Sequence, residues 1–193
     1  MMTINDLVIK SRSYRSFSPD IKLTKDDVAE LIDVARKVPS ARNLQPIKYR
    51  ICVSPEECEK MLSLTSWAGL LRPLALPPEG HAPSAYIVIC ADNELSPAGT
   101  NRFLGVDIGI AAQTIMLAAA EKGLGGCILG AFSAEKVSDA LGIDERYIPM
   151  LILALGKPDE VAVIEDSEDG KTAYYRENGI HRVPKRKLED III

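Results

Sequence analysis

The 193-residue sequence lacks most of the features that mark a metal site or a hydrolase. It has only two histidines and four cysteines, with no CxxC pair and no histidine at a ligand spacing from any cysteine, which argues against zinc. It contains no GxSxG motif, and neither histidine belongs to a recognisable triad. We therefore expect no metal ion and no side-chain nucleophile.

The sequence also lacks an excess of positive charge and a long uninterrupted apolar run. Its 27 acidic and 23 basic residues give a net charge of -4, so no bulk field attracts nucleic acid or an anionic membrane. No apolar stretch precedes Lys10, and the apolar run at residues 103–123 is interrupted by residues such as Asp107 and Gln113. Neither nucleic acid nor a membrane is expected as a partner, and a cytoplasmic location is expected.

The chain alternates patterns of helix and strand. Helical spacing, N-cap residues or both predict four helices, at residues 25–37, 54–64, 103–122 and 133–141. Short runs rich in Val, Ile and Leu predict four strands, at residues 49–53, 85–91, 126–130 and 149–155. A sheet covered by helices follows, and one domain over residues 1–193 is the simplest organisation for this length.

Two segments have no clear period. Residues 67–84 are long for a connection inside a compact domain, so they are expected to be a functional or mobile loop. Trp67 and His81 in this loop are weak candidates for a substrate pocket. Loop packing explains Trp67 equally well, and a surface position explains His81 better. Residues 161–193 are polar and cannot form a core alone, which predicts an extended C-terminal arm lying over the domain or over a partner subunit.

Two groups of polar side chains are suited to binding a phosphorylated ligand. Arg12, Ser13 and Arg15 offer guanidinium groups and a hydroxyl that suit a phosphate, and Lys185 and Lys187 could join them. An exposed helix end and a solvated basic run explain the same residues if nothing brings them together.

The second group lies in a loop bounded by two prolines. Pro39, Ser40, Asn43 and Gln45 could present hydrogen-bonding groups to a planar heterocycle, or could simply form a turn.

The glycine-rich run at residues 123–130 is not a dinucleotide-binding loop. It follows a helix, enters a strand, and has Ile128 where a third glycine is required. Gly130 could still let the backbone approach a ligand, because a residue without a side chain permits close contact.

Taken in order, these segments resemble the nitroreductase-like FMN oxidoreductase family. The similarity rests on the basic opening, the PSA-N-QP loop, the alanine-rich helix, the glycine-rich strand and the basic C-terminus. The resemblance implies an α+β fold of three layers, with a mixed and mostly antiparallel sheet between helices. It also implies a homodimer that exchanges C-terminal arms and holds two FMN molecules at its interface.

The resemblance assigns a set of FMN-binding residues. They are Arg12, Ser13, Arg15, Pro39, Ser40, Asn43, Gln45, Gly130, Lys185 and Lys187. One departure is Ser11, where many members have arginine, so the phosphate would depend more on Arg12 and the C-terminal lysines.

The implied activity passes reducing equivalents from NAD(P)H through flavin N5 to a small organic acceptor, such as a nitroaromatic or a quinone, in a ping-pong reaction. The flavin carries this chemistry, which agrees with the lack of a catalytic side chain. Alternatives are a non-catalytic FMN-storage protein, dehalogenation or enoyl reduction within the same superfamily, and a colourless interaction domain. The residues distinguish neither NADH from NADPH nor one acceptor from another.

Overall fold

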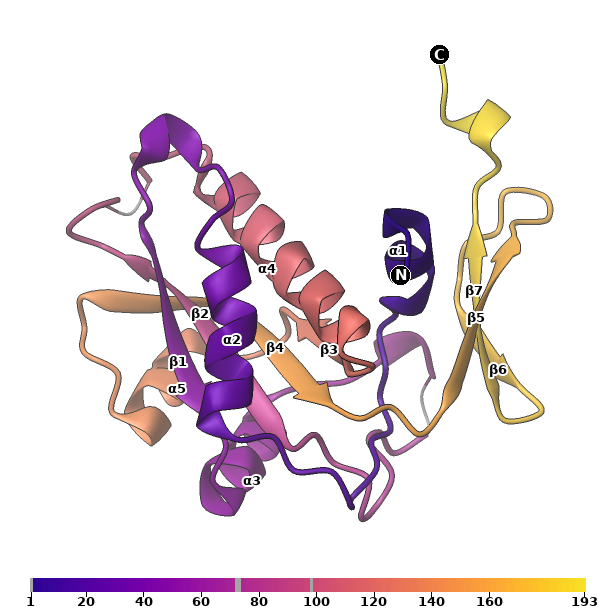
Figure 1. Cartoon of the computed structure of the whole chain (residues 1–193), viewed down its shortest axis with the longest axis horizontal. Helices are drawn as coiled ribbons and strands as arrows, with labels where there is room; N and C mark the ends of the chain where they lie inside the picture. Colours follow the sequence, from indigo (N-terminus) through magenta and orange to yellow (C-terminus); the bar gives the residue numbers. More distant parts are fainter. Residues whose placement is uncertain (1, 72–73, 98) are drawn as a thin grey trace.

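Strand β2 (Ala85–Asp92) forms the centre of the fold, and each of its eight residues is buried. The computed structural model describes residues 2–71, 74–97 and 99–193 (Figure 1). In the main sheet β2 lies between two neighbours, and the strand order is β1 (Ile47–Cys52), β2, β4 (Tyr147–Gly156) and β3 (Gly125–Leu129). All three pairs of neighbouring strands are antiparallel.

Helices cover both faces of this sheet. Alternate side chains of a strand point to opposite faces, so Ile87 and Ile89 pack on one side while Tyr86 and Val88 pack on the other. The first side is covered by α2 (Lys25–Ala35) and α4 (Leu104–Glu121), and the second by α3 (Pro55–Leu64) and α5 (Ala134–Leu141). The expected three-layer α+β fold is confirmed.

The predicted helix starts are confirmed by their caps. In α2 the Thr24 hydroxyl accepts the Asp27 N–H at 3.1 Å, and the Asp27 carboxylate accepts the Thr24 N–H at 2.8 Å. Ser54 caps α3 in a similar way through the Glu57 N–H. Helix α2 ends at Ala35, two residues before its predicted end, and the helix α1 (Ile4–Lys10) was not predicted.

Helix α4 is long and apolar because it is the core helix. Among the described residues it is the one helix whose length and composition would allow it to cross a membrane, but half of it is buried inside the protein. Its exposed side carries Phe103, Val106 and Ile110, whose exposed fractions are 45%, 56% and 36%. This side of α4 has no partner within the described chain.

The C-terminal residues form a second, small sheet rather than a simple extended arm. Strand β7 (Ile180–Lys185) pairs in parallel with β5 (Val161–Asp166) and antiparallel with β6 (Tyr175–Glu177). Backbone hydrogen bonds order these polar strands without a core of their own. Beyond β7 the chain extends away from the rest of the protein (Figure 1). It ends in exposed apolar residues that include Leu188 and Ile192.

Candidate functional site

A cavity of about 320 Å³ lies where the N-terminal segment, α4, β3 and the C-terminal sheet meet. Its lining includes three basic residues and no carboxylate, and we call it the cationic cavity. The lining residues are Ser11, Arg12, Ser13, Arg15, Gln113, Met116, Gly126, Ile128, Tyr174, His181, Val183 and Lys185. Four of the predicted site residues, Arg12, Ser13, Arg15 and Lys185, therefore lie together although they come from opposite ends of the chain.

Two glycines of β3 permit close packing, Gly125 against the N-terminal segment and Gly126 against β4. The Tyr14 N–H donates to the Gly126 carbonyl at 2.9 Å. A Cβ atom on Gly125 would lie 2.6 Å from the Tyr14 ring, and one on Gly126 would lie 2.0 Å from the Ala154 carbonyl oxygen. The glycine-rich run is therefore required for close packing beside the cavity.

Arg15 is a buried cation whose guanidinium has no carboxylate partner among the described residues. Its side chain donates from Nη1 to the Ser13 carbonyl at 3.1 Å and contacts His181 Nε2 at 3.0 Å, and its Cζ lies 4.9 Å from the Tyr174 ring centre. The nearby Glu160 carboxylate accepts the Arg15 backbone N–H and pairs with Arg176 instead. The positive charge of Arg15 thus remains available to a ligand.

His181 is neutral at pH 7. Burial, together with the charges of Arg15 and Arg176, lowers the pKa of His181 to about 4. A neutral imidazole can accept a hydrogen bond at Nε2, so His181 orients Arg15 without neutralising it.

Arg12 adds a second available cation. Its Nη2 donates to the Val8 carbonyl at 2.6 Å, which aligns the side chain along α1. The buried Nε atoms of Arg12 and Arg15 have no hydrogen-bond partner among the described residues. An anion bound here would accept hydrogen bonds from these buried donors and would balance the positive charges.

The loop at residues 39–46, here called the amide loop, lies at the other end of α4. Its Ser40 hydroxyl accepts the Gln45 N–H at 3.1 Å, and Gln45 Nε2 donates to Asn43 Oδ1 at 3.1 Å. Asn43 and Gln45 have positive φ angles of 53° and 51°. The Ala41 N–H donates to the buried Asp107 Oδ1 at 2.9 Å, which fixes the loop to α4.

One subunit does not bring the amide loop to the cationic cavity. Pro39, Ser40 and Gln45 line a separate cavity of about 190 Å³, which also contains Asp107. Asp107 and Met116 are nine positions apart on α4, and at roughly 100° per residue they lie on opposite sides of the helix. The two predicted halves of the site are therefore separated by the core helix.

The other predicted residues lie outside the cationic cavity. Lys187 is exposed before the turn at Leu188–Asp190, and Gly130 is exposed just after β3 with open space around it. Trp67 donates from Nε1 to the Thr65 hydroxyl at 3.1 Å and packs against the core on the α3 side. His81 Nδ1 forms a hydrogen bond with the Asp159 carboxylate.

Sequence analysis missed several residues of the cationic cavity, namely Gln113, Met116, Tyr174 and His181. Gln113 interrupts an apolar helix, which is a usable signal for a functional polar residue. Tyr174 and His181 lie in polar segments whose pairing is determined by long-range contacts, so no local pattern marks them.

The cysteines are placed as small core residues. Cys52, Cys90 and Cys127 are buried, and burial raises the pKa values of their thiols, to about 12 for Cys52 and about 11 for Cys90. Within residues 2–71, 74–97 and 99–193, no group of three or more His, Cys, Asp and Glu side chains could hold a metal ion.

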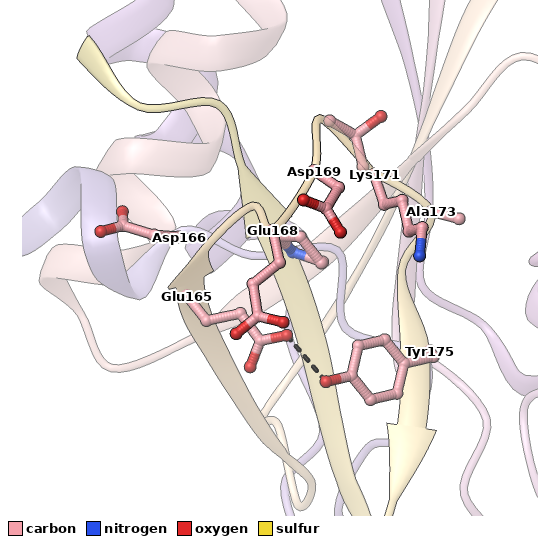
Figure 2. A pocket seen from close by; sticks show the side chains of 9 residues that line it. Glu165, Asp166, Glu168, Asp169, Lys171, Ala173 and Tyr175 are labelled. Atoms are coloured by element: carbon pink, nitrogen blue, oxygen red, sulfur yellow. Dashed lines mark hydrogen bonds between the residues drawn. The ribbon is translucent and has the colours of Figure 1, made fainter. Parts of the chain in front are cut away.

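A larger cavity of about 760 Å³ lies in the C-terminal sheet. Figure 2 shows its carboxylates, among them Glu165, Glu168 and Asp169, and the Tyr175 hydroxyl that donates to Glu165 at 2.8 Å. The abundance of negative charge would repel a phosphate group. Size alone therefore does not identify the phosphate site.

Comparison with known proteins agrees with the fold. The model of the nitroreductase family matches residues 9–157. The Bacillus subtilis protein named "Putative NAD(P)H nitroreductase YdgI" is 27% identical, over 81% of this chain and 90% of its own length. The Bacillus subtilis protein named "FMN reductase (NADPH)" is also 27% identical, over 90% of this chain and 72% of its own length.

Solved structures share the fold at lower identity. A nitroreductase family protein from Streptococcus pneumoniae has a TM-score of 0.71 and 20% identity, and the similarity covers 99% of both chains. A structure from Exiguobacterium sibiricum, titled as a putative nitroreductase in complex with FMN, has a TM-score of 0.66 and 19% identity, covering 83% of this chain and 90% of that one. Because the family model spans most of the sequence and the fold is shared, the chain belongs to the nitroreductase family.

Proposed function

We propose that this chain is a cytoplasmic, FMN-dependent oxidoreductase. It passes reducing equivalents from NAD(P)H to a small organic acceptor, such as a nitroaromatic or a quinone, in a ping-pong reaction. Membership of the nitroreductase family supports an oxidoreductase. The names of the FMN reductase relative and of the FMN complex support the choice of flavin.

The cationic cavity is the observation that carries this proposal. Arg12, Arg15 and Lys185 line it without any carboxylate, and two buried guanidinium nitrogens there have no partner among the described residues. These groups fit a phosphate, which is doubly charged near pH 7 and rich in acceptor oxygens. Arg12, Ser13, Arg15 and Lys185 would hold the FMN phosphate.

The amide loop would bind the flavin ring from a second subunit. Ser40, Asn43 and Gln45 offer donors and acceptors that suit the edge of the ring, but in one subunit they lie across α4 from the phosphate groups. A homodimer in which the exposed side of α4 is buried would place one subunit's loop near the other's cavity. Phe103, Val106 and Ile110 provide the apolar contact surface for such a dimer.

The protein residues in this proposal bind and orient rather than transfer protons. When bound, FMN supplies two-electron redox chemistry at N5, so no catalytic acid or base is required of the chain. Arg15 and Arg12 contribute positive charge, and neutral His181 orients Arg15. Gly130 leaves room for close approach of the backbone to a ligand, because nothing lies within 4 Å of a Cβ built there.

A storage protein would need its cofactor covered. None of the described residues between 67 and 84 lines the cationic cavity, so within one subunit this loop does not close it. This arrangement favours an accessible cofactor and hence turnover.

The test is the absorbance spectrum of the purified protein, followed by chromatography of the chromophore released by heat. We expect about one FMN per subunit and oxidation of NAD(P)H with menadione as the acceptor. FAD, or no flavin, would refute the proposal. FMN without turnover would support the storage alternative.

A further inference from the structure

A second cavity with uncompensated positive charge lies beside the amide loop. It has a volume of about 510 Å³, lies between that loop and the segment leading into α4, and is here called the loop cavity. Arg42 and Arg102 line it, and neither forms an ion pair with a carboxylate of the described residues. The Arg102 guanidinium lies 4.6 Å from the centre of the Phe103 ring, which holds it at the cavity.

Two buried donors in the loop cavity have no partner in the part of the chain that the structure describes. Ser96 is 2% exposed, and its hydroxyl makes no hydrogen bond among the described residues. The buried Nδ2 atom of Asn101 is also unpaired, while its Oδ1 atom accepts the Phe103 N–H at 3.0 Å and so fixes the orientation of the amide. Buried polar groups are rarely left unpaired, so both donors indicate a missing acceptor.

The surroundings of the cavity also favour negative charge. Helix α4 begins at Leu104, directly after the cavity residues Asn101 to Phe103, and its N-cap Phe103 offers no capping side chain. The partial positive charge of this helix end adds to that of the two guanidinium groups. The carboxylate in the first turn of α4, Asp107, lines the neighbouring cavity of the amide loop and not the loop cavity. Its Oδ1 accepts the Ala41 N–H, and its buried Oδ2 has no partner among the described residues.

We propose that the loop cavity binds a phosphate group of the nicotinamide co-substrate. Two guanidinium groups, a hydroxyl and an amide supply more donors than the two oxygens of a carboxylate can use, and a phosphate matches them better. Leu44, Leu95 and Phe103, whose exposed fractions are 37%, 41% and 45%, offer an apolar surface for the attached nucleoside.

This inference rests on the proposed function through the position of Arg42. Arg42 lies in the amide loop between Ser40 and Asn43, which are assigned to the flavin ring. A phosphate held by Arg42 is therefore bound next to the site where the nicotinamide would meet the flavin. Its source is either the 2'-phosphate of NADPH or the diphosphate that NADH and NADPH share.

The test is calorimetric titration of the purified, full-length protein with 2',5'-ADP, 5'-ADP and adenosine. We expect both nucleotides, but not adenosine, to bind. A marked preference for 2',5'-ADP would assign the cavity to the 2'-phosphate. A preference for 5'-ADP, which carries the 5'-diphosphate that 2',5'-ADP lacks, would assign it to the diphosphate. The variant Arg42→Gln/Arg102→Gln should weaken binding by about tenfold or more, because charge-assisted hydrogen bonds are lost.

Two further variants make the test specific. Ser96→Ala removes one donor without changing the charge, and should weaken binding by a few-fold. Lys60→Gln removes an exposed cation that pairs with Glu56 on α3, and should leave binding unchanged. Unchanged affinity in the double variant, or a loss caused by Arg12→Gln instead, would overturn the proposal. A colourless protein that shows the expected losses would refute the flavin function while the phosphate site stands.

Discussion

Arg15 and His181 are 166 positions apart in the chain, yet their side chains meet at 3.0 Å. The contact joins the N-terminal segment to the C-terminal sheet at the cationic cavity. Because His181 is neutral, it orients the guanidinium and leaves its charge for a ligand. Both ends of the chain thus line the cationic cavity, where we propose that the FMN phosphate binds.

The buried histidine makes the protein sensitive to acid. The pKa of His181 is about 4 in the folded protein against an ordinary 6.5, so the unfolded chain binds more protons between these values. The contribution of His181 to the free energy of unfolding is fully present above pH 6.5. It is lost as the pH falls toward 4, by up to about 3 kcal/mol. Chemical denaturation of the wild type and of His181→Gln across this range checks it. Equal pH slopes for the two proteins would contradict the expectation.

Arg12 should matter for FMN affinity. Replacing Arg12 with alanine removes a cation that lines the cavity, and the loss of a hydrogen bond to a charged group should weaken FMN binding by about 1.5–3 kcal/mol. Flavin titration of the apoprotein measures this, with Lys60→Ala as the control at an exposed cation on another helix. An unchanged dissociation constant would mean that Arg12 serves only to cap the N-terminal helix.

Asp107 should hold the amide loop in place. Asp107→Ala leaves the Ala41 N–H without its acceptor, and is expected to destabilise the fold by about 1–3 kcal/mol and to loosen residues 40–46. Asp107→Asn keeps an acceptor oxygen and should cost less. Hydrogen exchange of the loop amides distinguishes the two variants. Identical protection in both would show that the loop holds its conformation without Asp107.

The glycines of β3 should differ in their tolerance of a side chain. Gly126→Ala would place Cβ 2.0 Å from the Ala154 carbonyl oxygen, so the main sheet must shift and thermal stability should fall. Gly130→Ala meets open space and should melt close to the wild type. Melting curves recorded side by side provide the comparison. Equal melting temperatures would mean that the sheet adjusts at no measurable cost.

Two truncations separate the roles of the C-terminal residues. A chain ending at Pro158 loses Glu160, Tyr174, His181 and Lys185, and should lose both FMN and dimerisation. A chain ending at Lys187 keeps these cavity residues but loses the exposed apolar end, so it should retain the cavity and dimerise more weakly. Light scattering and flavin absorbance measure both. A stable yellow dimer ending at Pro158 would show that the C-terminal residues are dispensable.

Local patterns predicted the main fold well. The reciprocal cap of Thr24 and Asp27 marked the start of α2, and the continuous apolar run of β2 marked a central strand. The C-terminal sheet was missed because its strands are polar and its parallel pairing joins Val161 to Ile180, a contact that no periodicity reveals. Similarity to the family predicted Arg15 and Lys185 as site residues. His181 lies in one of these polar strands, so it could be found only from the folded chain.

Helix α4 separates the cationic cavity from the amide loop within one subunit, and in the proposed dimer this separation has a genetic consequence. A subunit with a defective cationic cavity would still supply a sound amide loop, and a subunit with a defective loop would still supply a sound cavity. Each variant alone would be inactive. Coexpression of the two would produce mixed dimers in which one of the two sites is intact, so pairs of alleles that fail singly are expected to complement each other.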